Sequence, residues 1–499
     1  MNKKQEIGIN PLSNLHLPEG WVLGEVQDLV KIRNGYAFKS EDFNVEKGVP
    51  VIRQTNLSTD PVNFDKPKFL PEDFLENHSG YKIEKGDVLI GLSGSIGSLS
   101  TYREDFPALQ NQRTGLLIEN VEGSKKYVEY FLLSIKRELN EVAKGVAVQN
   151  ISSKQIERWP IPIAPLEQQK RIVAEIEKQF SRLDEAVANL KRVKANIKRY
   201  KAAVLKAAVE GKLTEEWRKQ HPDVEPASKI LERIKTDRKE RHKAQLSEWT
   251  EVVKSWELGG KKDKKPAKPR KPIDLSALSA DDLGRLSALP PEWTWVKLGN
   301  CNVDVFDGPF GSNLKSSDYV EKGIRVIRLE NIGELEFIDE KKTYISESKY
   351  DGLKKHTVSF GDIIFSSFIA GSTRVVSLPK QIDVAINKAD CFCVRVHGET
   401  LLIRFLEMFL GTRNAYNQLA MEIHGATRPR INTTQLKECA IPLCSIAEQN
   451  AIVMEVDRKV SRLSELEKEV GANLVRAESL RQSILSKAFS RGVFNERSR

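Results

Sequence analysis

The sequence IPIAPLEQQKRIV at residues 161–173 returns as IPLCSIAEQNAIV at residues 441–453, an offset of 280 residues (441 − 161). The alignment continues without a gap, so that Ser181-Arg182-Leu183 meets Ser461-Arg462-Leu463. The mismatches between these points are mostly conservative. A match of this length indicates an internal duplication, which decides the architecture of the whole chain.

The duplication extends upstream into two globular segments. Matching stretches, at offsets that differ as loops of different length require, are 17–21 with 289–293, 46–48 with 321–323, 51–56 with 326–331, and 85–90 with 360–365. β-Branched runs between Gly, Asn and Pro predict strands at 49–52, 87–92, 114–118, 324–329, 362–368 and 391–396. Helices are expected at 127–141 and 401–418. We therefore expect an α+β fold with two homologous mixed domains.

A long helix is predicted after each globular segment. Apolar residues recur at heptad spacing. They are Ile176, Phe180, Leu183, Val187, Leu190, Ile197 and Val204 in the first helix, and Val456, Val460, Leu463, Val470, Leu474 and Ile484 in the second. Lys194, Lys201, Glu467 and Arg481 interrupt these stripes. We favour pairing of the two helices over packing of each on its own domain, because both stripes are long, narrow and matched in register.

Helix-end signals frame both predicted helices. Pro165 and a Ser445–Glu448 capping box mark the starts, and Gly211 and Gly492 mark the ends. The expected domains are 1–165, 166–213 (first long helix), 214–288, 289–444 and 445–499 (second long helix).

Residues 214–288 have no counterpart in the second half. A charged helix is expected at 227–256, followed by a Lys/Pro-rich run at 259–272 that predicts an extended linker. Two interpretations of this run stay open: a simple tether, or additional affinity for nucleic-acid phosphate.

Composition narrows the classes of function. The 499 residues include 79 Lys and Arg against 69 Asp and Glu, a net charge of +10 that suits a polyanionic partner. No secretory signal or membrane span is expected, and five cysteines without a CxxC pair suggest a reduced, cytoplasmic setting. No phosphate-binding loop, metal-ligand spacing or nucleophile–base pair is recognisable, so we expect no catalytic residues and no metal site.

Polar and basic residues near strand ends are the candidates for DNA contact, since Arg, Lys, Asn and Gln suit base edges in the major groove. The candidates are Lys39, Arg53, Gln54, Asn56, Gln112, Arg113, Lys315, Arg328, Asn331, Arg374, Lys388, Arg428 and Arg430. Arg53 and Asn56 recur as Arg328 and Asn331, which equally fits a shared folding need such as a strand-end turn. Residues that differ between the copies are better candidates for specificity.

The alternation of globular segment and long helix, twice over, resembles the specificity subunits of type I restriction–modification systems. The resemblance rests on the Ile-Pro-hydrophobic step with Gln169 and Gln449, the Leu-Pro-x-x-Trp entries at Trp21 and Trp293, and the strands near 86–87 and 361–362. It implies two target recognition domains that read a bipartite duplex DNA site, separated by an antiparallel coiled coil. It also implies two modification subunits and restriction/translocase subunits as partners, which carry S-adenosylmethionine, ATP and Mg.

Two alternatives remain beside this resemblance. One is a coiled-coil scaffold whose globular ends bind proteins, and the other is an enzyme with an unrecognised nuclease site. Target bases and gap length do not follow from the sequence.

Overall fold

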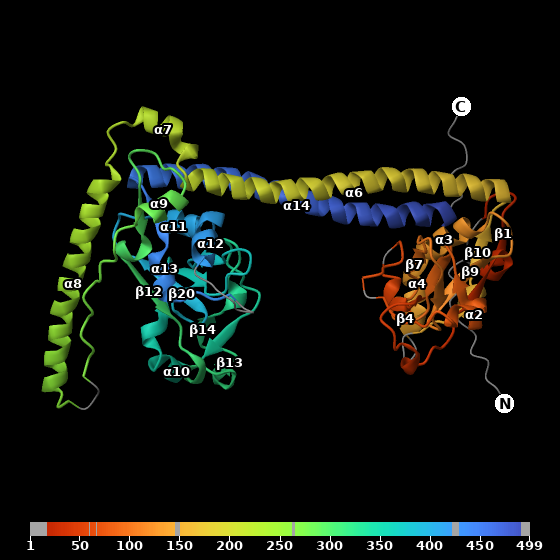
Figure 1. Cartoon of the computed structure of the whole chain (residues 1–499), viewed down its shortest axis with the longest axis horizontal. Helices are drawn as coiled ribbons and strands as arrows, with labels where there is room; N and C mark the ends of the chain where they lie inside the picture. The colour runs from red at the N-terminus through yellow and green to blue at the C-terminus, as the bar shows by residue number, and fades with distance from the viewer. Residues whose placement is uncertain are drawn as a thin grey trace. The chain divides into compact units, whose positions relative to one another are not determined.

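The computed structural model describes residues 17–490, except residues 59, 66, 145–149, 262–264 and 422–428. The chain forms two compact units, residues 1–192 with 470–499 and residues 193–469. Each unit holds one globular domain and a part of each long helix (Figure 1). The predicted duplication is therefore visible as two related units, which are described separately below.

The first globular domain contains two four-stranded sheets and one short ribbon. The sheet orders are β2-β9-β6-β7 and β4-β3-β8-β5, and β1 pairs with β10. The strands are β1 (Val22–Glu25), β2 (Val30–Asn34), β3 (Val49–Ile52), β4 (Phe69–Leu70), β5 (Lys82–Ile83), β6 (Val88–Gly91), β7 (Leu99–Thr101), β8 (Ala108–Gln110), β9 (Thr114–Glu119) and β10 (Pro160–Ile163). All pairings are antiparallel except β3 with β8. Helices α1 (Val26–Leu29), α2 (Phe74–Asn77), α3 (Lys125–Ser134), α4 (Lys136–Lys144) and α5 (Ser153–Glu157) complete the domain.

The second globular domain repeats this topology. Its sheets are β12-β20-β17-β18 and β13-β15-β14-β19-β16, with β11 paired to β21, and the one parallel pairing is β14 with β19. The strands are β11 (Thr294–Lys297), β12 (Val303–Asp307), β13 (Tyr319–Val320), β14 (Ile324–Ile327), β15 (Thr343–Ile345), β16 (Thr357–Val358), β17 (Ile363–Ser366), β18 (Val375–Ser377), β19 (Ala385–Asn387), β20 (Cys391–Val396) and β21 (Ala440–Leu443). Its helices are α10 (Glu347–Asp351), α11 (Ile403–Leu410), α12 (Arg413–Ala420) and α13 (Thr433–Glu438).

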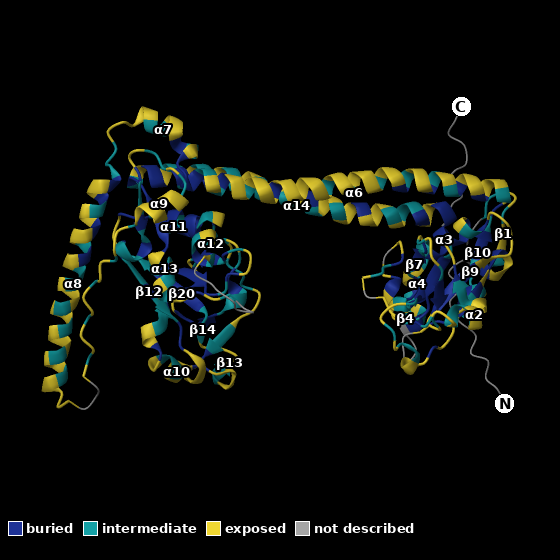
Figure 2. Ribbon diagram, viewed as in Figure 1, coloured by how far each residue is buried: buried dark blue, intermediate teal, exposed yellow. Residues whose placement is uncertain are grey.

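The predicted strands are confirmed, but three of them are shorter than predicted, at β6, β14 and β17. Two predicted helices are divided. The run predicted at 324–329 leaves the sheet after Ile327 and turns into a 3-10 helix (Leu329–Asn331). The helices expected at 127–141 and 401–418 each break near their middle, at α3/α4 and α11/α12. Buried apolar residues from strands and helices form the core of each domain, and the ribbon of both domains is largely coloured as buried in its interior (Figure 2). Cys391 and Cys393 lie buried in one cluster on the same face of β20, as their spacing indicates.

The long helices α6 (Leu166–Val209) and α14 (Ile446–Ser490) contact each other within each unit. In the first unit Arg481 of α14 pairs with Asp184 and lies 4.3 Å from the centre of the Phe180 ring. Leu485 and Phe489, still later in α14, share a core with Ile176, which is earlier in α6. In the second unit Lys201 Nζ lies 2.7 Å from Glu467 Oε2, while later α6 residues pack against earlier α14 residues. The helices therefore run antiparallel in both units.

The predicted seam positions all face away from solvent. Ile176, Phe180, Ile197, Val204, Val456 and Val470 are buried, and Leu183, Val187, Leu190, Val460, Leu463, Leu474 and Ile484 are half-buried. Three of the charges that interrupt the stripes contact the opposite helix. Lys201 and Glu467 pair with each other, and Arg481 pairs with Asp184 and lies over the Phe180 ring. Charged seam positions thus contribute cross-helix contacts instead of breaking the pairing.

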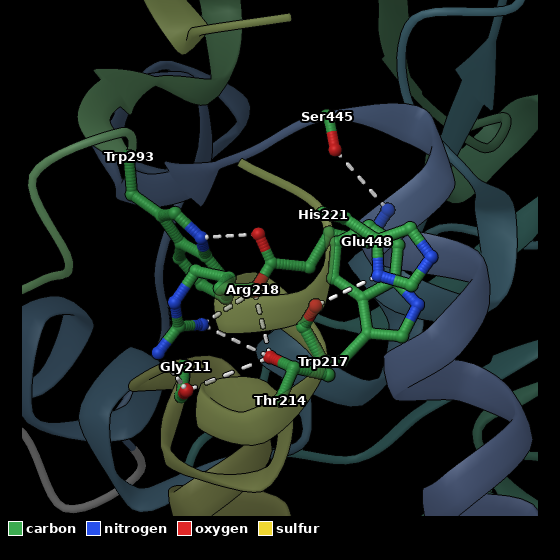
Figure 3. Close-up of polar contacts among 8 residues, drawn as sticks. All are labelled: Gly211, Thr214, Trp217, Arg218, His221, Trp293, Ser445 and Glu448. Atoms are coloured by element: carbon green, nitrogen blue, oxygen red, sulfur yellow. Dashed lines mark hydrogen bonds and ion pairs between the residues drawn. The ribbon is translucent and has the colours of Figure 1, made fainter. Parts of the chain in front are cut away.

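A tryptophan at each domain entry fixes the start of the following long helix. In the second unit, the Trp293 indole donates to Glu448 Oε2 at 2.8 Å, and Thr214 and Arg218 both bind Glu448 Oε1, at 2.7 and 2.5 Å (Figure 3). Glu448 is buried. Its backbone N–H donates to Ser445 Oγ at 3.2 Å, so the predicted capping box is formed on the Ser445 side. The Glu448 carboxylate faces Trp293 and Arg218, which corrects the other half of that prediction.

The first unit builds the same junction with neutral groups. The Trp21 indole donates to Gln168 Oε1 at 2.8 Å, and Gln168 is the repeat counterpart of Glu448. The next residue has one role in both units: the side-chain amide of Gln169 donates to Ala164 O at 2.8 Å, and that of Gln449 donates to Cys444 O at 2.9 Å. These repeated residues hold the turn from strand to long helix.

The segment without a counterpart in the repeat belongs to the second unit. It contains α7 (Glu215–Gln220), α8 (Ala227–Leu258) and α9 (Ala280–Arg285). Gly211, with φ +72°, ends the turn after α6 as predicted. Ile230 and Ile234 of α8 are buried in the core of the second domain. The Gly492 end signal and the candidate Arg428 lie outside the described residues.

Candidate nucleic-acid interface

Three loops meet at the same strand ends in each domain, and together we call them the rim. They are the 3-10 turn after β3 or β14, the loop after β6 or β17, and the connection between β8 and β9 or between β19 and β20. In the first domain, Leu92 N donates to Arg113 O at 3.2 Å, which ties the second loop to the third. Ser367 N donates to Asp390 O at 2.9 Å at the matching place in the second domain.

A buried asparagine shapes the first loop of both rims. Asn56 accepts the Arg53 N–H at 3.0 Å and donates to Asn63 O at 2.7 Å. Asn331 accepts the Arg328 N–H at 3.0 Å and donates to Ile338 O and Lys341 O. Because their amide groups are engaged by backbone, these two candidates act as turn formers in the described structure. Their recurrence therefore reflects the shared folding need that the repeat suggested.

The rim of the second domain gathers six of its candidates, namely Asn331 and the basic residues Lys315, Arg328, Arg374, Lys388 and Arg430. Lys388 Nζ lies 2.7 Å from the Tyr319 hydroxyl, and the Arg328 guanidinium lies 5.5 Å from the same ring. Lys388 also donates to Leu314 O at 3.3 Å, beside the exposed Lys315. Tyr319 was not among the candidates. An alternation of basic and aromatic groups is typical of nucleic-acid surfaces.

Arg374 and Arg430 continue this rim on the β17 side. Arg374 donates to Leu329 O and to Ser366 Oγ, both at 3.3 Å. Arg430 pairs with Asp390 and lies 4.5 Å from the centre of the Phe368 ring. Asp390 and Phe368 were also missed by the sequence analysis, although aligning the β19–β20 connection with 111–113 places Asp390 opposite Arg113.

The rim of the first domain is more open. Gln112 and Arg113 are exposed on the third loop. Gln54 lies against Gly94 of the second loop, where a side chain would come within 2.7 Å of its amide. Asn150, which pairs with Ser93 through a β-bridge, stands where Arg430 stands in the second domain. Lys39 is exposed, and its Nζ lies 3.4 Å from Glu41 Oε1, so the carboxylate partly neutralises its positive charge.

Exposed aromatic side chains flank both rims. Tyr36 is 39% exposed and Phe310 is 62% exposed. Tyr36 comes one residue after Gly35 and Phe310 two residues after Gly308, and both glycines press against the third loop: a Cβ at either would lie 2.2 Å from backbone atoms of that loop. A glycine with an aromatic residue one or two positions later is the signal that could have found these positions. Such rings offer apolar contact to base methyl groups.

One acidic group of the second rim, Asp307, has a perturbed pKa. Asp307, at the end of β12, has its pKa raised to about 6 because burial disfavours the ionised carboxylate. The Gly308 N–H donates to Asp307 Oδ1 at 2.7 Å and the nearby Arg430 opposes the rise. The first domain carries the exposed, neutral Asn34 at this strand end.

Within the ranges given above, no group of three or more His, Cys, Asp or Glu side chains could hold a metal ion. None of the described helices is long and apolar enough to cross a membrane.

Comparison with known proteins agrees with the duplicated architecture. Residues 18–199 match the model of the type I restriction modification DNA specificity domain. The chain is 25% identical to the type I restriction enzyme EcoBI specificity subunit of Escherichia coli, over 97% of this chain and 88% of the relative. It is 21% identical to the EcoKI specificity subunit of Escherichia coli strain K12, over 95% of this chain and 89% of the relative.

A solved structure supports the fold. A chain from a study of complex assembly and conformational transition of the type I R-M system superposes with a TM-score of 0.58 at 18% identity. The alignment covers 95% of this chain and 99% of that one. Two domains with matching topology, antiparallel helices and sequence similarity over nearly the whole length lead to one conclusion: the chain is similar to the type I restriction–modification specificity subunits.

Proposed function

We propose that this chain reads a bipartite duplex DNA target, one half-site with each globular domain, as the specificity subunit of a type I restriction–modification complex. One observation carries the proposal. The two rims share a backbone frame, yet they present different side chains at matching positions, such as Arg113 against Asp390 and Asn150 against Arg430. Homologous domains that carry different side chains on their rims are suited to reading two different half-sites.

The chemistry is assigned to partner subunits. We infer that two modification subunits and restriction/translocase subunits bind this chain and carry S-adenosylmethionine, ATP and Mg. The chain itself contributes recognition and no catalysis, and the complex acts on DNA in the cytoplasm. The similarity to type I restriction enzyme specificity subunits supports this division of labour.

Single rim substitutions test the reading of DNA. In the complete complex, Arg113→Ala should alter base preference in one half-site only, because it removes an exposed guanidinium from the first rim. Arg430→Ala should alter the other half-site only. Methylation mapping across the genome of an expressing host measures both effects. Arg103→Ala is the matched control, since Arg103 is exposed in the first domain but follows β7, away from the rim loops.

The outcomes separate the hypotheses. Changes in both half-sites from one substitution would contradict modular reading. Replacement of residues 22–150 by the equivalent domain of a relative should change one half-site and leave the gap unchanged. A protein-binding scaffold, the alternative, would instead show no sequence-dependent DNA binding.

A further inference from the structure

Residues 265–272 of the Lys/Pro-rich run, here called the strap, lie against α8. Pro266, Pro269 and Pro272 are half-buried and three residues apart, whereas Lys265, Lys268, Arg270 and Lys271 are exposed. Proline favours the polyproline II conformation, in which three residues make one turn, so this spacing would place the prolines on one face. The four cations then occupy the remaining faces.

Two tryptophans of α8 receive the strap. The Trp249 indole donates to Pro266 O at 3.0 Å, and Lys268 Nζ lies 5.8 Å from the centre of that ring. Lys265 Nζ lies 6.0 Å from the Trp256 ring, one heptad further along α8. Aromatic grooves of this kind bind proline-rich segments well, because the polyproline II conformation is already ordered.

The base of α8 anchors this arm to the second domain. Arg238 is buried and donates to Asp274 Oδ1, Ile273 O and Asn300 O at 2.8 to 3.2 Å. Arg241 lies 2.8 Å from Asp304 of β12. Beyond this base, α8 runs beside the domain toward the end that carries α10 and β13 (Figure 1). The rim residues around Tyr319 of β13 lie toward that end as well.

We propose that the part of α8 beyond Arg241 and residues 265–272, together called the arm, contact the phosphate backbone of duplex DNA without reading bases. This inference rests on the proposed function, because it assigns the arm to DNA flanking the half-site of the second domain. Eight residues of polyproline II span about 25 Å, roughly seven base-pair steps. The four exposed cations lie on a segment that packs against α8, and their positive charges complement the negative charges of DNA phosphates.

Neutralisation of the strap tests the proposal in the purified full chain. The variant carries Lys265→Gln, Lys268→Gln, Arg270→Gln and Lys271→Gln, which keep the prolines. Each lost phosphate contact reduces the slope of log affinity against log salt by about 0.9. We therefore expect the slope on a random-sequence duplex to fall by about 2 to 4. The matched control neutralises four exposed cations of α6, Lys191, Arg192, Lys198 and Arg199, and should change the slope much less.

The readouts keep this proposal apart from the proposed function. Discrimination between the target found by methylation mapping and a scrambled duplex should persist in the strap variant, since the rims are unchanged. A wild-type chain that shows no discrimination contradicts the proposed function, whereas the salt slope still tests the arm. An unchanged slope, or an equal change in the α6 control, overturns the arm. Loss of partner-subunit assembly with an unchanged slope also overturns it, because the arm would then be a protein-docking surface.

Discussion

The two halves of the chain build the same junction and the same rim but place different charges in them. At the junctions, Trp21 binds the neutral Gln168 at the surface, whereas Trp293 binds the buried Glu448. At the rims, the position of Arg113 in the first domain holds Asp390 in the second. At these rims the backbone-engaged Asn56 and Asn331 are retained between the halves, whereas the exposed Arg113 and the ion-paired Asp390 differ. Folding therefore constrains one set of residues, and recognition is left to the other.

Removal of the Glu448 carboxylate should give the largest difference between the halves. Glu448→Ala leaves Arg218, Thr214 and the Trp293 indole without their shared acceptor, and loss of one member of a buried ion pair costs about 3–5 kcal/mol. Gln168→Ala removes one exposed hydrogen bond and should cost about 0.5–1.5 kcal/mol. Urea denaturation followed by circular dichroism measures both free energies of unfolding.

A third junction variant sharpens that comparison. Glu448→Gln copies the first junction, so it should lie between wild type and Glu448→Ala: the amide still accepts from Trp293, but Arg218 loses its anion. Glu478→Ala, at an exposed position of α14, serves as the control. Equal losses from Glu448→Ala and Gln168→Ala would show that the buried charge network adds nothing to the second junction.

The buried asparagines should give the next largest effect. Asn331→Ala removes three hydrogen bonds and leaves the Arg328 N–H and the Ile338 carbonyl unpaired, while Lys341 O still accepts from Arg325. Asn56→Ala removes two hydrogen bonds. Unpaired buried polar groups cost about 1–3 kcal/mol. We expect Asn331→Ala near the upper end of that range and Asn56→Ala below it, by urea denaturation. Thr55→Ala, exposed in the same turn, should be close to neutral, and a similar loss there would assign the effect to the turn as a whole.

The repeat and the heptad stripes predicted most of the fold, because both are patterns that can be recognised directly in the sequence. Ile176 and Val456 are fully buried where the stripes predict, and Asn56 and Asn331 take the turn-forming role that their recurrence suggested. Side chains that act across the chain could not be predicted in this way. Arg218 meets Glu448 from 230 residues away, so no spacing rule brings them together.

The rim and the strap show the same limit. Tyr319 becomes part of the rim only when the fold brings it beside Lys388, 69 residues later. The Lys/Pro run indicates an extended chain, as observed, but its docking depends on Trp249 and Trp256, which lie on a separate helix. Composition describes a segment alone and does not identify the surface that receives it.

The smallest expected effect is a pH dependence confined to the second rim. Burial raises the pKa of Asp307 to about 6 from an ordinary value of 3.8, so the folded chain binds this proton more tightly than the unfolded chain does. The contribution of Asp307 to stability is therefore highest at low pH and falls as the pH rises from about 4 through about 6. Above that window the contribution is constant and at its lowest.

Asp307→Asn removes this titration and gives the second rim the residue type of the first. The free energy of unfolding of the variant minus that of wild type should rise with pH between about 4 and 6 and then level off. DNA binding by wild type should also strengthen relative to the variant as the pH falls through about 6, because a negative charge beside Arg430 is lost. Asn34→Asp is the control: its carboxylate would be exposed, so the corresponding difference should show no such rise across this window. A flat difference for Asp307→Asn would mean that this carboxylate is solvated as well as its counterpart, and that the two rims do not differ at this position.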